Sequence, residues 1–164
     1  MENIYHDYWQ QELMYQFLEE DKCKKKAYVC SPYSAENNEG MLQNMRTARA
    51  YMFYALKKMG MCARAPHAFL PMLLCDSVPS ERAIALKLLE RSDVLLVCGN
   101  CISNGMKSEI ANAAMLRMPI IVFDDMLYLE VQKLVTQKNG DKKTVKLESN
   151  HIPMSLSNPI SYME

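Results

Sequence analysis

Short apolar runs alternate with segments of helical periodicity along most of the chain. A continuous apolar run such as Val94–Val97 is typical of a strand buried on both faces, whereas apolar residues at helical spacing indicate an amphipathic helix. Gly60 follows the longest such segment and is expected to end it in the C′ position. We predict strands over residues 27–30, 61–65, 93–98, 119–123 and 143–147, and helices over 4–20, 40–59, 79–91, 105–117 and 126–138.

This order of elements predicts an α/β protein. Strands that alternate with helices form βαβ units and a mainly parallel sheet, and right-handed crossovers then give a doubly wound, Rossmann-like, three-layer α/β/α sandwich. The length of 164 residues suits a single domain, residues 1–164. Within it we expect an appended N-terminal helix over 4–20, a core over 26–148 and a polar tail over 149–164.

Composition and charge narrow the class of protein. The chain is 49% hydrophobic and carries 19 basic and 19 acidic side chains, so a folded domain is expected and a nucleic-acid polymer is not an expected partner. The run Lys24–Lys26 is short and is interpreted as a solvated entry to the first strand. No apolar segment reaches a membrane-spanning length, and the N-terminus lacks a signal-peptide pattern. We therefore expect a cytoplasmic protein, with no membrane partner and with free thiols.

The segment 93–110 carries the strongest indication of chemistry. Its apolar run is followed by the polar loop residues Ser103, Asn104 and Gly105, and then by a helical pattern that contains Glu109. Free N–H groups at a helix N-terminus favour a phosphate or carboxylate, and open α/β sheets bind ligands at this edge. The pattern predicts a site for a phosphate-bearing small molecule beside a carboxylate. Ser103 could serve as helix N-cap as well, and the alternative for Glu109 is an exposed helix residue.

Three short motifs in order resemble the nucleoside 2-deoxyribosyltransferase-like superfamily. They are Ala27-Tyr-Val-Cys-Ser-Pro-Tyr-Ser34, Ala65-Pro-His67 and Ser103-Asn-Gly-Met-Lys-Ser-Glu109, and the resemblance covers roughly residues 26–123. It is strongest to a branch found in bacteria and their phages, which is related to deoxyribonucleoside 5′-monophosphate N-glycosidase. The resemblance implies a flavodoxin-like fold, a homodimer or larger homo-oligomer, and cleavage or transfer at the N-glycosidic bond of a nucleotide or nucleoside, with no metal and no organic cofactor.

The resemblance also implies roles for particular residues. Glu109 matches the nucleophile, and Tyr28 matches the tyrosine that lies beside the sugar and the nucleophile. Ser103 matches the serine that holds the 5′-phosphate. The remaining expected ligand contacts lie in the loops after the first and third strands and at the start of the following helix: Ser31, Pro32, Tyr33, Gly99, Asn104, Gly105 and Met106.

One position departs from the pattern of the superfamily. The acid that assists the leaving base in similar proteins corresponds here to Ala85, which cannot donate a proton. Glu81 lies one turn earlier on the same predicted helix face, with Arg82 beside it, and either could serve the site in its place. A protein without this acid could instead bind or sequester a nucleotide-derived, ADP-ribose-like signal without cleaving it.

Other candidates keep two interpretations. His67 follows the second predicted strand and lies either near the ligand or in a packed or surface position. Asp76 with Arg82 forms either part of the site or an ion pair. Cys98 and Cys101 form a C-x-x-C pair, but no second pair has zinc spacing and the helix starts too far downstream for a redox motif, so free thiols are expected.

Overall fold

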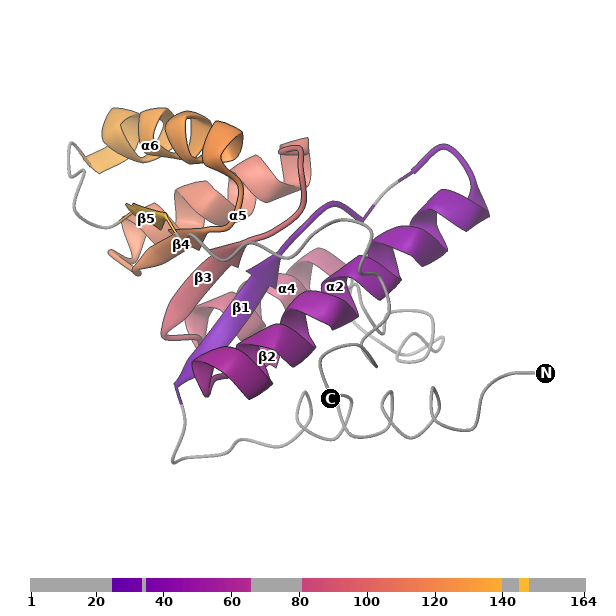
Figure 1. Cartoon of the computed structure of the whole chain (residues 1–164). Coiled ribbons are helices and arrows are strands. Elements are labelled where there is room, and N and C mark those ends of the chain that lie inside the picture. The colour runs from indigo at the N-terminus through magenta and orange to yellow at the C-terminus, as the bar shows by residue number, and fades with distance from the viewer. Residues whose placement is uncertain (1–24, 34, 66–80, 140–144, 148–164) are drawn as a thin grey trace.

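A five-stranded parallel sheet forms the centre of the molecule. The computed structural model describes residues 25–33, 35–65, 81–139 and 145–147 (Figure 1). The strands are β1 (Lys26–Cys30), β2 (Cys62–Arg64), β3 (Val94–Val97), β4 (Ile120–Val122) and β5 (Val145–Leu147). The helices are α2 (Asn38–Met59), α4 (Glu81–Glu90), α5 (Asn104–Met115) and α6 (Asp125–Asn139).

The strand order is β2-β1-β3-β4-β5, and every neighbouring pair is parallel. This order is that of the flavodoxin-like fold, and it confirms the α/β class with a Rossmann-like, doubly wound sheet. The chain moves outward from β1 to β2 and then returns across the sheet to β3. The winding direction therefore reverses between β1 and β3, which makes the carboxyl ends of these two strands the topological switch point.

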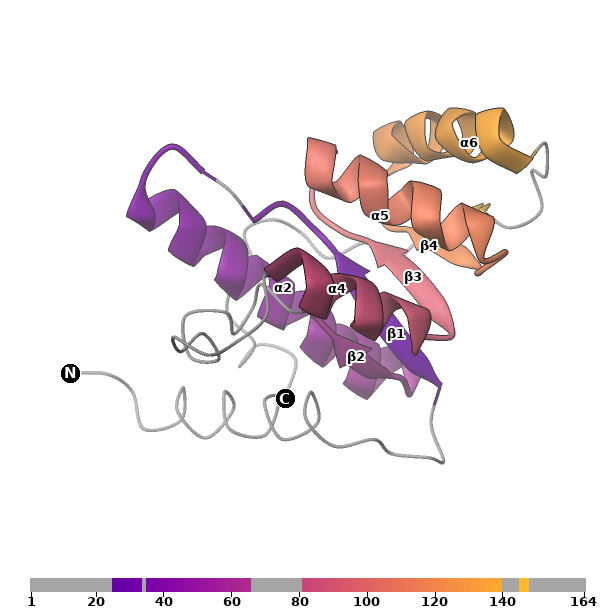
Figure 2. The ribbon, with the colours of Figure 1, turned by 180° about the vertical axis from the view of Figure 1, so that it is seen from behind.

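Helices cover both faces of the sheet and complete three layers. Helix α2 lies on one face, and α4, α5 and α6 lie on the other, as the two opposite views show (Figures 1 and 2). The alternation of side chains along β1 serves both layers. Ala27 and Val29 pack into the core cluster under α2, whereas Tyr28 and Cys30 pack into the cluster under α5 and α6.

The ends of α2 explain its length. Asn37 is the N-cap, and its side-chain oxygen accepts a hydrogen bond from the Gly40 N–H at 2.8 Å. At the other end Gly60 adopts the left-handed conformation, with φ of 67°. The predicted glycine stop is thus confirmed, and the helix begins two residues before the predicted start at residue 40 because Asn37 caps it.

Helix α5 starts as expected but ends two residues before the predicted boundary at 117. Ser103 is its N-cap and accepts from the Met106 N–H at 3.2 Å. At its C-terminus the Arg117 N–H donates to the Ala114 carbonyl at 3.0 Å and the Met118 N–H to the Ala113 carbonyl at 2.9 Å. These bonds form a Schellman motif in which Arg117 takes the left-handed position, with φ of 55°, and so the helix cannot continue.

The other predicted strands and helices of the core agree with the structure to within two residues for all described ends. The predicted helix over 4–20 and the tail over 149–164 lie outside the described residues. Within the described part of the chain, no helix combines the length and the apolar composition needed to cross a membrane.

Candidate active site at the β1–β3 switch point

A hydrogen bond joins Tyr28 of β1 to Glu109 of α5. The Tyr28 hydroxyl donates to Glu109 Oε1 at 3.0 Å, although the two residues are 81 positions apart in sequence. Tyr28 is completely buried, whereas Glu109 keeps part of its surface exposed. The structure therefore brings together two of the three residues, Tyr28, Glu109 and Glu81, for which catalytic roles were expected.

Local folding explains why these side chains meet. Tyr28 lies on the face of β1 that α5 covers, opposite the face occupied by Ala27 and Val29. Helix α5 begins at the Ser103 cap, and Glu109 lies in its second turn. On the same helix, Met106 and Ile110 are buried against the sheet, so the helix surface between them holds Glu109 toward Tyr28.

Burial controls the ionisation of this pair. Removal from water raises the pKa of Glu109 from 4.5 to about 7, and hydrogen bonds from Cys30 and Tyr28 oppose that rise because they favour the charged form. Burial and the neighbouring Glu109 raise the pKa of Tyr28 well above its ordinary value. At neutral pH, Tyr28 is therefore a neutral hydrogen-bond donor beside a carboxyl group that can ionise.

The loops after β1 and β3 pack closely beside this pair. Ser31 is 5% exposed and directly follows β1, and the Cys98 N–H donates to the Cys30 carbonyl at 2.8 Å. Gly99 has φ of 91°, and a Cβ atom at this position would lie 3.1 Å from Pro32 Cδ. A glycine is required here both by the backbone conformation and by the close approach of Pro32.

The N-terminus of α5 is open to solvent. Ser103, Asn104 and Gly105 are exposed, whereas Met106 is buried in the core. The Ser103 N–H also donates to Met106 Sδ at 3.4 Å, so the cap and Met106 hold each other in place. The predicted Ser103 cap is confirmed, whereas Asn104 and Gly105, expected in the polar loop, already belong to the helix. Met106, an expected ligand contact, is buried in the core.

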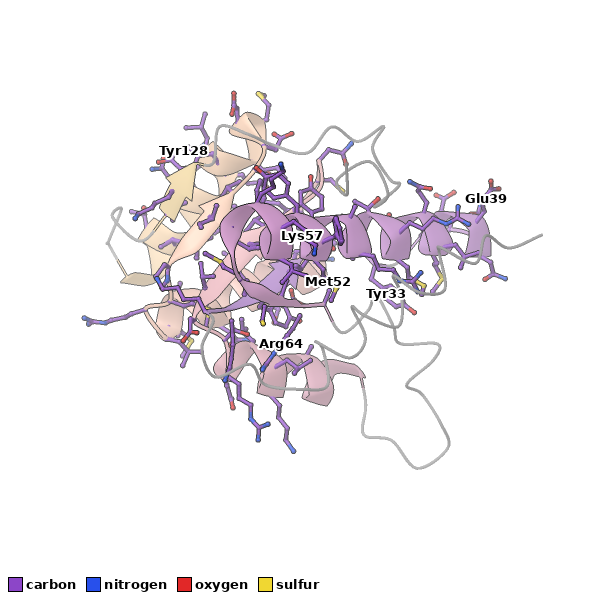
Figure 3. The ribbon with its side chains drawn as sticks, turned by 60° about the horizontal axis from the view of Figure 1, so that its bottom comes forward. Tyr33, Glu39, Met52, Lys57, Arg64 and Tyr128 are labelled. Carbon is purple, nitrogen blue, oxygen red and sulfur yellow. The ribbon has the colours of Figure 1, made fainter. Side chains whose placement is uncertain are left out.

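Tyr33 takes a different position from the other loop residues. Its carbonyl accepts a hydrogen bond from Asn44 Nδ2 at 3.0 Å, which fixes it to α2. Figure 3 shows Tyr33 beside that helix. Tyr33 therefore lies on the α2 side of the sheet, whereas Tyr28 and Glu109 lie on the α5 side.

Helix α4 contributes the position at which the expected acid is missing. Ala85 is half-buried and packs against the core cluster that contains Tyr28, Cys30 and Met106. Glu81 and Arg82 belong to the first turn of the same helix, but their side chains lie outside the described part of the structure. His67 and Asp76 also lie outside the described residues.

Two residues near the site were not predicted. Cys30 is completely buried and is close enough to Glu109 to influence the pKa of its carboxyl group, and a lone cysteine in an apolar run gave no sign of this role. Arg64 is 2% exposed and pairs in register with Tyr28 on the neighbouring strand, so its side chain leaves the sheet on the Tyr28 face. In Figure 3 it lies beside α4. An arginine at the end of a short strand pattern looks like a solvated strand end in sequence.

Other features of the described residues lie apart from this pair. An open cavity of about 600 Å³ runs along the first turns of α2, and its lining includes Asn37, Leu42 and Arg46 but neither Tyr28 nor Glu109. Cys98 and Cys101 are free thiols, as expected, the first buried and the second exposed. Among the described residues, no three His, Cys, Asp or Glu side chains gather closely enough to hold a metal ion.

The fold and this site together define a flavodoxin-like α/β protein with a tyrosine–glutamate pair at its switch point. The chain belongs to the family described as Domain of unknown function (DUF7768), whose model matches residues 25–123. That span runs from β1 to the end of β4 and includes both Tyr28 and Glu109. No curated protein and no solved structure matches the chain.

Proposed function

We propose that the protein cleaves the N-glycosidic bond of a nucleotide or nucleoside, or transfers its deoxyribosyl group, with Glu109 as the nucleophile. The observation that carries this proposal is the Tyr28–Glu109 hydrogen bond of 3.0 Å at the β1–β3 switch point. A part-exposed carboxyl group with its pKa raised to about 7 is suited to attack a carbon atom near neutral pH. The superfamily resemblance of the motifs around both residues supports the same chemistry.

The reaction would proceed in two displacements, as in a retaining glycosidase. The Glu109 carboxylate attacks the anomeric carbon while the bond to the base breaks, and the base leaves with that electron pair and takes up a proton. The Tyr28 hydroxyl orients the carboxylate through its hydrogen bond. Water then attacks the same carbon, gives up a proton and regenerates the carboxylate. A second base in place of water gives deoxyribosyl transfer.

A phosphate on the substrate would bind at the start of α5. Ser103 and Gly105 are exposed there, and the first N–H groups of a helix favour an anion. The first turn of α5 contains no acidic residue that would repel it. Ser31, Pro32 and Gly99 would form the adjoining wall, because the two loops that carry them are in contact.

The described residues of the proposed site do not include a proton donor for the departing base. Ala85 packs into the apolar cluster beside Tyr28 and offers no proton. Loss of one general acid typically slows a reaction about 10²–10⁴-fold, so Glu81 would have to supply the proton, or Arg82 would have to stabilise the negative charge on the departing base. The same observation favours a second candidate function, which is sequestration of an intact nucleotide-derived, ADP-ribose-like molecule at this site.

One experiment separates the two functions. The purified protein is incubated with pooled nucleosides, deoxynucleotides and ADP-ribose derivatives, and the solution and the protein-bound fraction are analysed by mass spectrometry. We expect release of a free base, a loss of at least about a thousandfold in Glu109→Gln, and no loss in Glu130→Gln, an exposed carboxylate on α6. Base release that persists in Glu109→Gln would refute the proposal. An intact ligand found only in the bound fraction would establish sequestration instead.

A further inference from the structure

The Cys30 thiol lies on the same face of β1 as Tyr28, under helix α5. Cys30 follows Tyr28 by two residues on β1, so both side chains face α5. Its Sγ atom lies 3.9 Å from the Met106 carbonyl oxygen, and Met106 precedes Glu109 by three residues on that helix. The Glu109 carboxyl group is close enough for the two groups to shift each other's pKa. The single thiol proton therefore has two acceptors within reach, one on the backbone and one on the nucleophile.

The thiol acts as a donor and not as a reactive group. Cys30 is completely buried, and burial together with the nearby Glu109 raises the pKa of the thiol well above its ordinary value. The proton consequently stays on sulfur at neutral pH, because a thiolate here would face both an apolar surrounding and a carboxylate. A protonated thiol is a weak hydrogen-bond donor that can rotate about its Cβ–Sγ bond.

We propose that Cys30 is a positioning residue for Glu109, whose thiol turns from the Met106 carbonyl to the Glu109 carboxylate when that group ionises. The inference deepens the proposed function, on which its catalytic meaning rests. When Glu109 is protonated, the Met106 carbonyl takes the thiol proton and Cys30 links β1 to the first turn of α5. When Glu109 is charged, Cys30 becomes its second hydrogen-bond donor, in addition to the Tyr28 hydroxyl.

The surroundings of Glu109 make this contribution measurable. Among the described side chains, the titratable groups that act on Glu109 are Tyr28 and Cys30, both from β1, and the buried Arg64 of β2 is not among them. The charged groups on the adjoining helices with a described placement, including Lys87 and Glu90 of α4, Lys107 of α5 and Glu130 of α6, are exposed to solvent. Exposed charges are screened, so loss of a buried donor should be visible above their effect.

The test follows the ionisation of Glu109 in the free protein by NMR of carbon-13-labelled glutamate carboxyl groups, with Glu109→Gln to assign the signal. Cys30→Ala is expected to move the midpoint upward by roughly half a pH unit, as for loss of one weak hydrogen bond to the charged form. Cys98→Ala is the matched control, since Cys98 is an equally buried free thiol that packs in the α2 cluster and bonds to the Leu96 carbonyl. The midpoint of the Glu109 titration in Cys98→Ala should equal that of the unchanged protein.

Cys30→Ser keeps a donor at the same position and is expected to hold the midpoint at or below that of the unchanged protein. The inference is overturned if Cys30→Ala titrates like the unchanged protein, if Cys98→Ala shifts as much, or if the serine variant shifts upward as far as the alanine variant. Because the titration needs no substrate, it succeeds or fails independently of base release. Failure of the proposed function would appear only in the mass-spectrometric assay, and failure of this inference only in the titration.

Discussion

The two faces of strand β1 have opposite characters. On the α2 face, Ala27 and Val29 pack under an apolar and aromatic layer in which the Tyr51 and Phe123 rings lie 5.3 Å apart. On the α5 face, Tyr28 and Cys30 alternate with Ala27 and Val29 along the strand. Tyr28 donates a hydrogen bond to the partly buried Glu109 carboxyl group, and Cys30 influences the pKa of that group. One face of the strand thus contributes to a stabilising apolar core. The other face supports a carboxyl group whose burial is unfavourable for the free energy of folding when the group is charged.

This difference indicates how the fold can tolerate the site. Burial of a carboxyl group lowers the free energy of unfolding wherever that group must be charged, whereas apolar burial raises it. The α2 face contains large fully buried side chains, Phe53 and Met52 among them. Changes on the two faces should therefore affect stability and ionisation in separable ways.

The largest expected change in stability is on the α2 face. Phe53 is completely buried in the cluster under α2, so Phe53→Ala should lower the free energy of unfolding by about 3–5 kcal/mol. Urea denaturation measures this value. A loss below about 1 kcal/mol would contradict the stabilising role assigned to this face.

Removal of the buried charge should stabilise the α5 face at alkaline pH. The folded-state pKa of Glu109 is about 7 and lies above the ordinary 4.5, so its contribution to stability is fully present below pH 4.5 and is lost as the pH rises through 7. Glu109→Gln lacks this dependence and should exceed the unchanged protein by on the order of 2 kcal/mol at pH 8. The gain should shrink strongly at pH 5.

Urea denaturation at both pH values checks this sign, with Glu130→Gln as an exposed control that should show little difference at either pH. A Glu109→Gln protein that is less stable than the unchanged protein at pH 8 would show that the ionised carboxylate is favoured by the fold. That result would contradict a Glu109 pKa that lies above its ordinary value in the folded protein.

A smaller change is expected from the tyrosine of the pair. Tyr28→Phe removes the hydroxyl that favours the charged form of Glu109, so its pKa should rise further, by about one unit. The acidic limb of the pH profile of kcat/KM should shift upward by the same amount, with a loss of about fivefold at pH 7 and almost none at pH 9. Tyr51→Phe, on the α2 face, should leave the limb in place. If the acidic limb of the pH profile does not move in Tyr28→Phe, the Tyr28 hydroxyl does not influence the ionisation of Glu109.

Much of this architecture could be predicted because it depends on local pattern. The apolar run at Val94–Val97 and the glycine stop at Gly60 are local signals, and both are confirmed. The spacing from Ser103 to Glu109 likewise predicted a carboxylate near a capped helix start. By contrast, the contacts of Cys30 depend on the pairing of β1 with α5 across 76 residues, which no local pattern expresses. A buried cysteine in a strand looks like any small apolar residue.

The smallest predicted effect concerns the end of a helix on each face. Helix α2 ends at Gly60, whereas the corresponding left-handed position after α5 is occupied by Arg117. Because a residue with a Cβ atom is disfavoured there, Arg117→Gly should raise the free energy of unfolding by roughly 0.5–1 kcal/mol. Gly60→Ala should lower it by at least a similar amount. Thermal or urea denaturation measures both, and a destabilising Arg117→Gly would indicate that the arginine side chain makes a compensating contact.

The most direct test of Glu109 as nucleophile is to trap the covalent intermediate. The protein is incubated with a nucleotide from which it releases base, quenched in acid within the first turnovers and digested for peptide mass spectrometry. We expect a sugar-phosphate adduct on the peptide that contains Glu109, and its absence from Glu109→Gln. An adduct on another residue, or base release with no adduct at the earliest times, would contradict a glutamate nucleophile at the β1–β3 switch point.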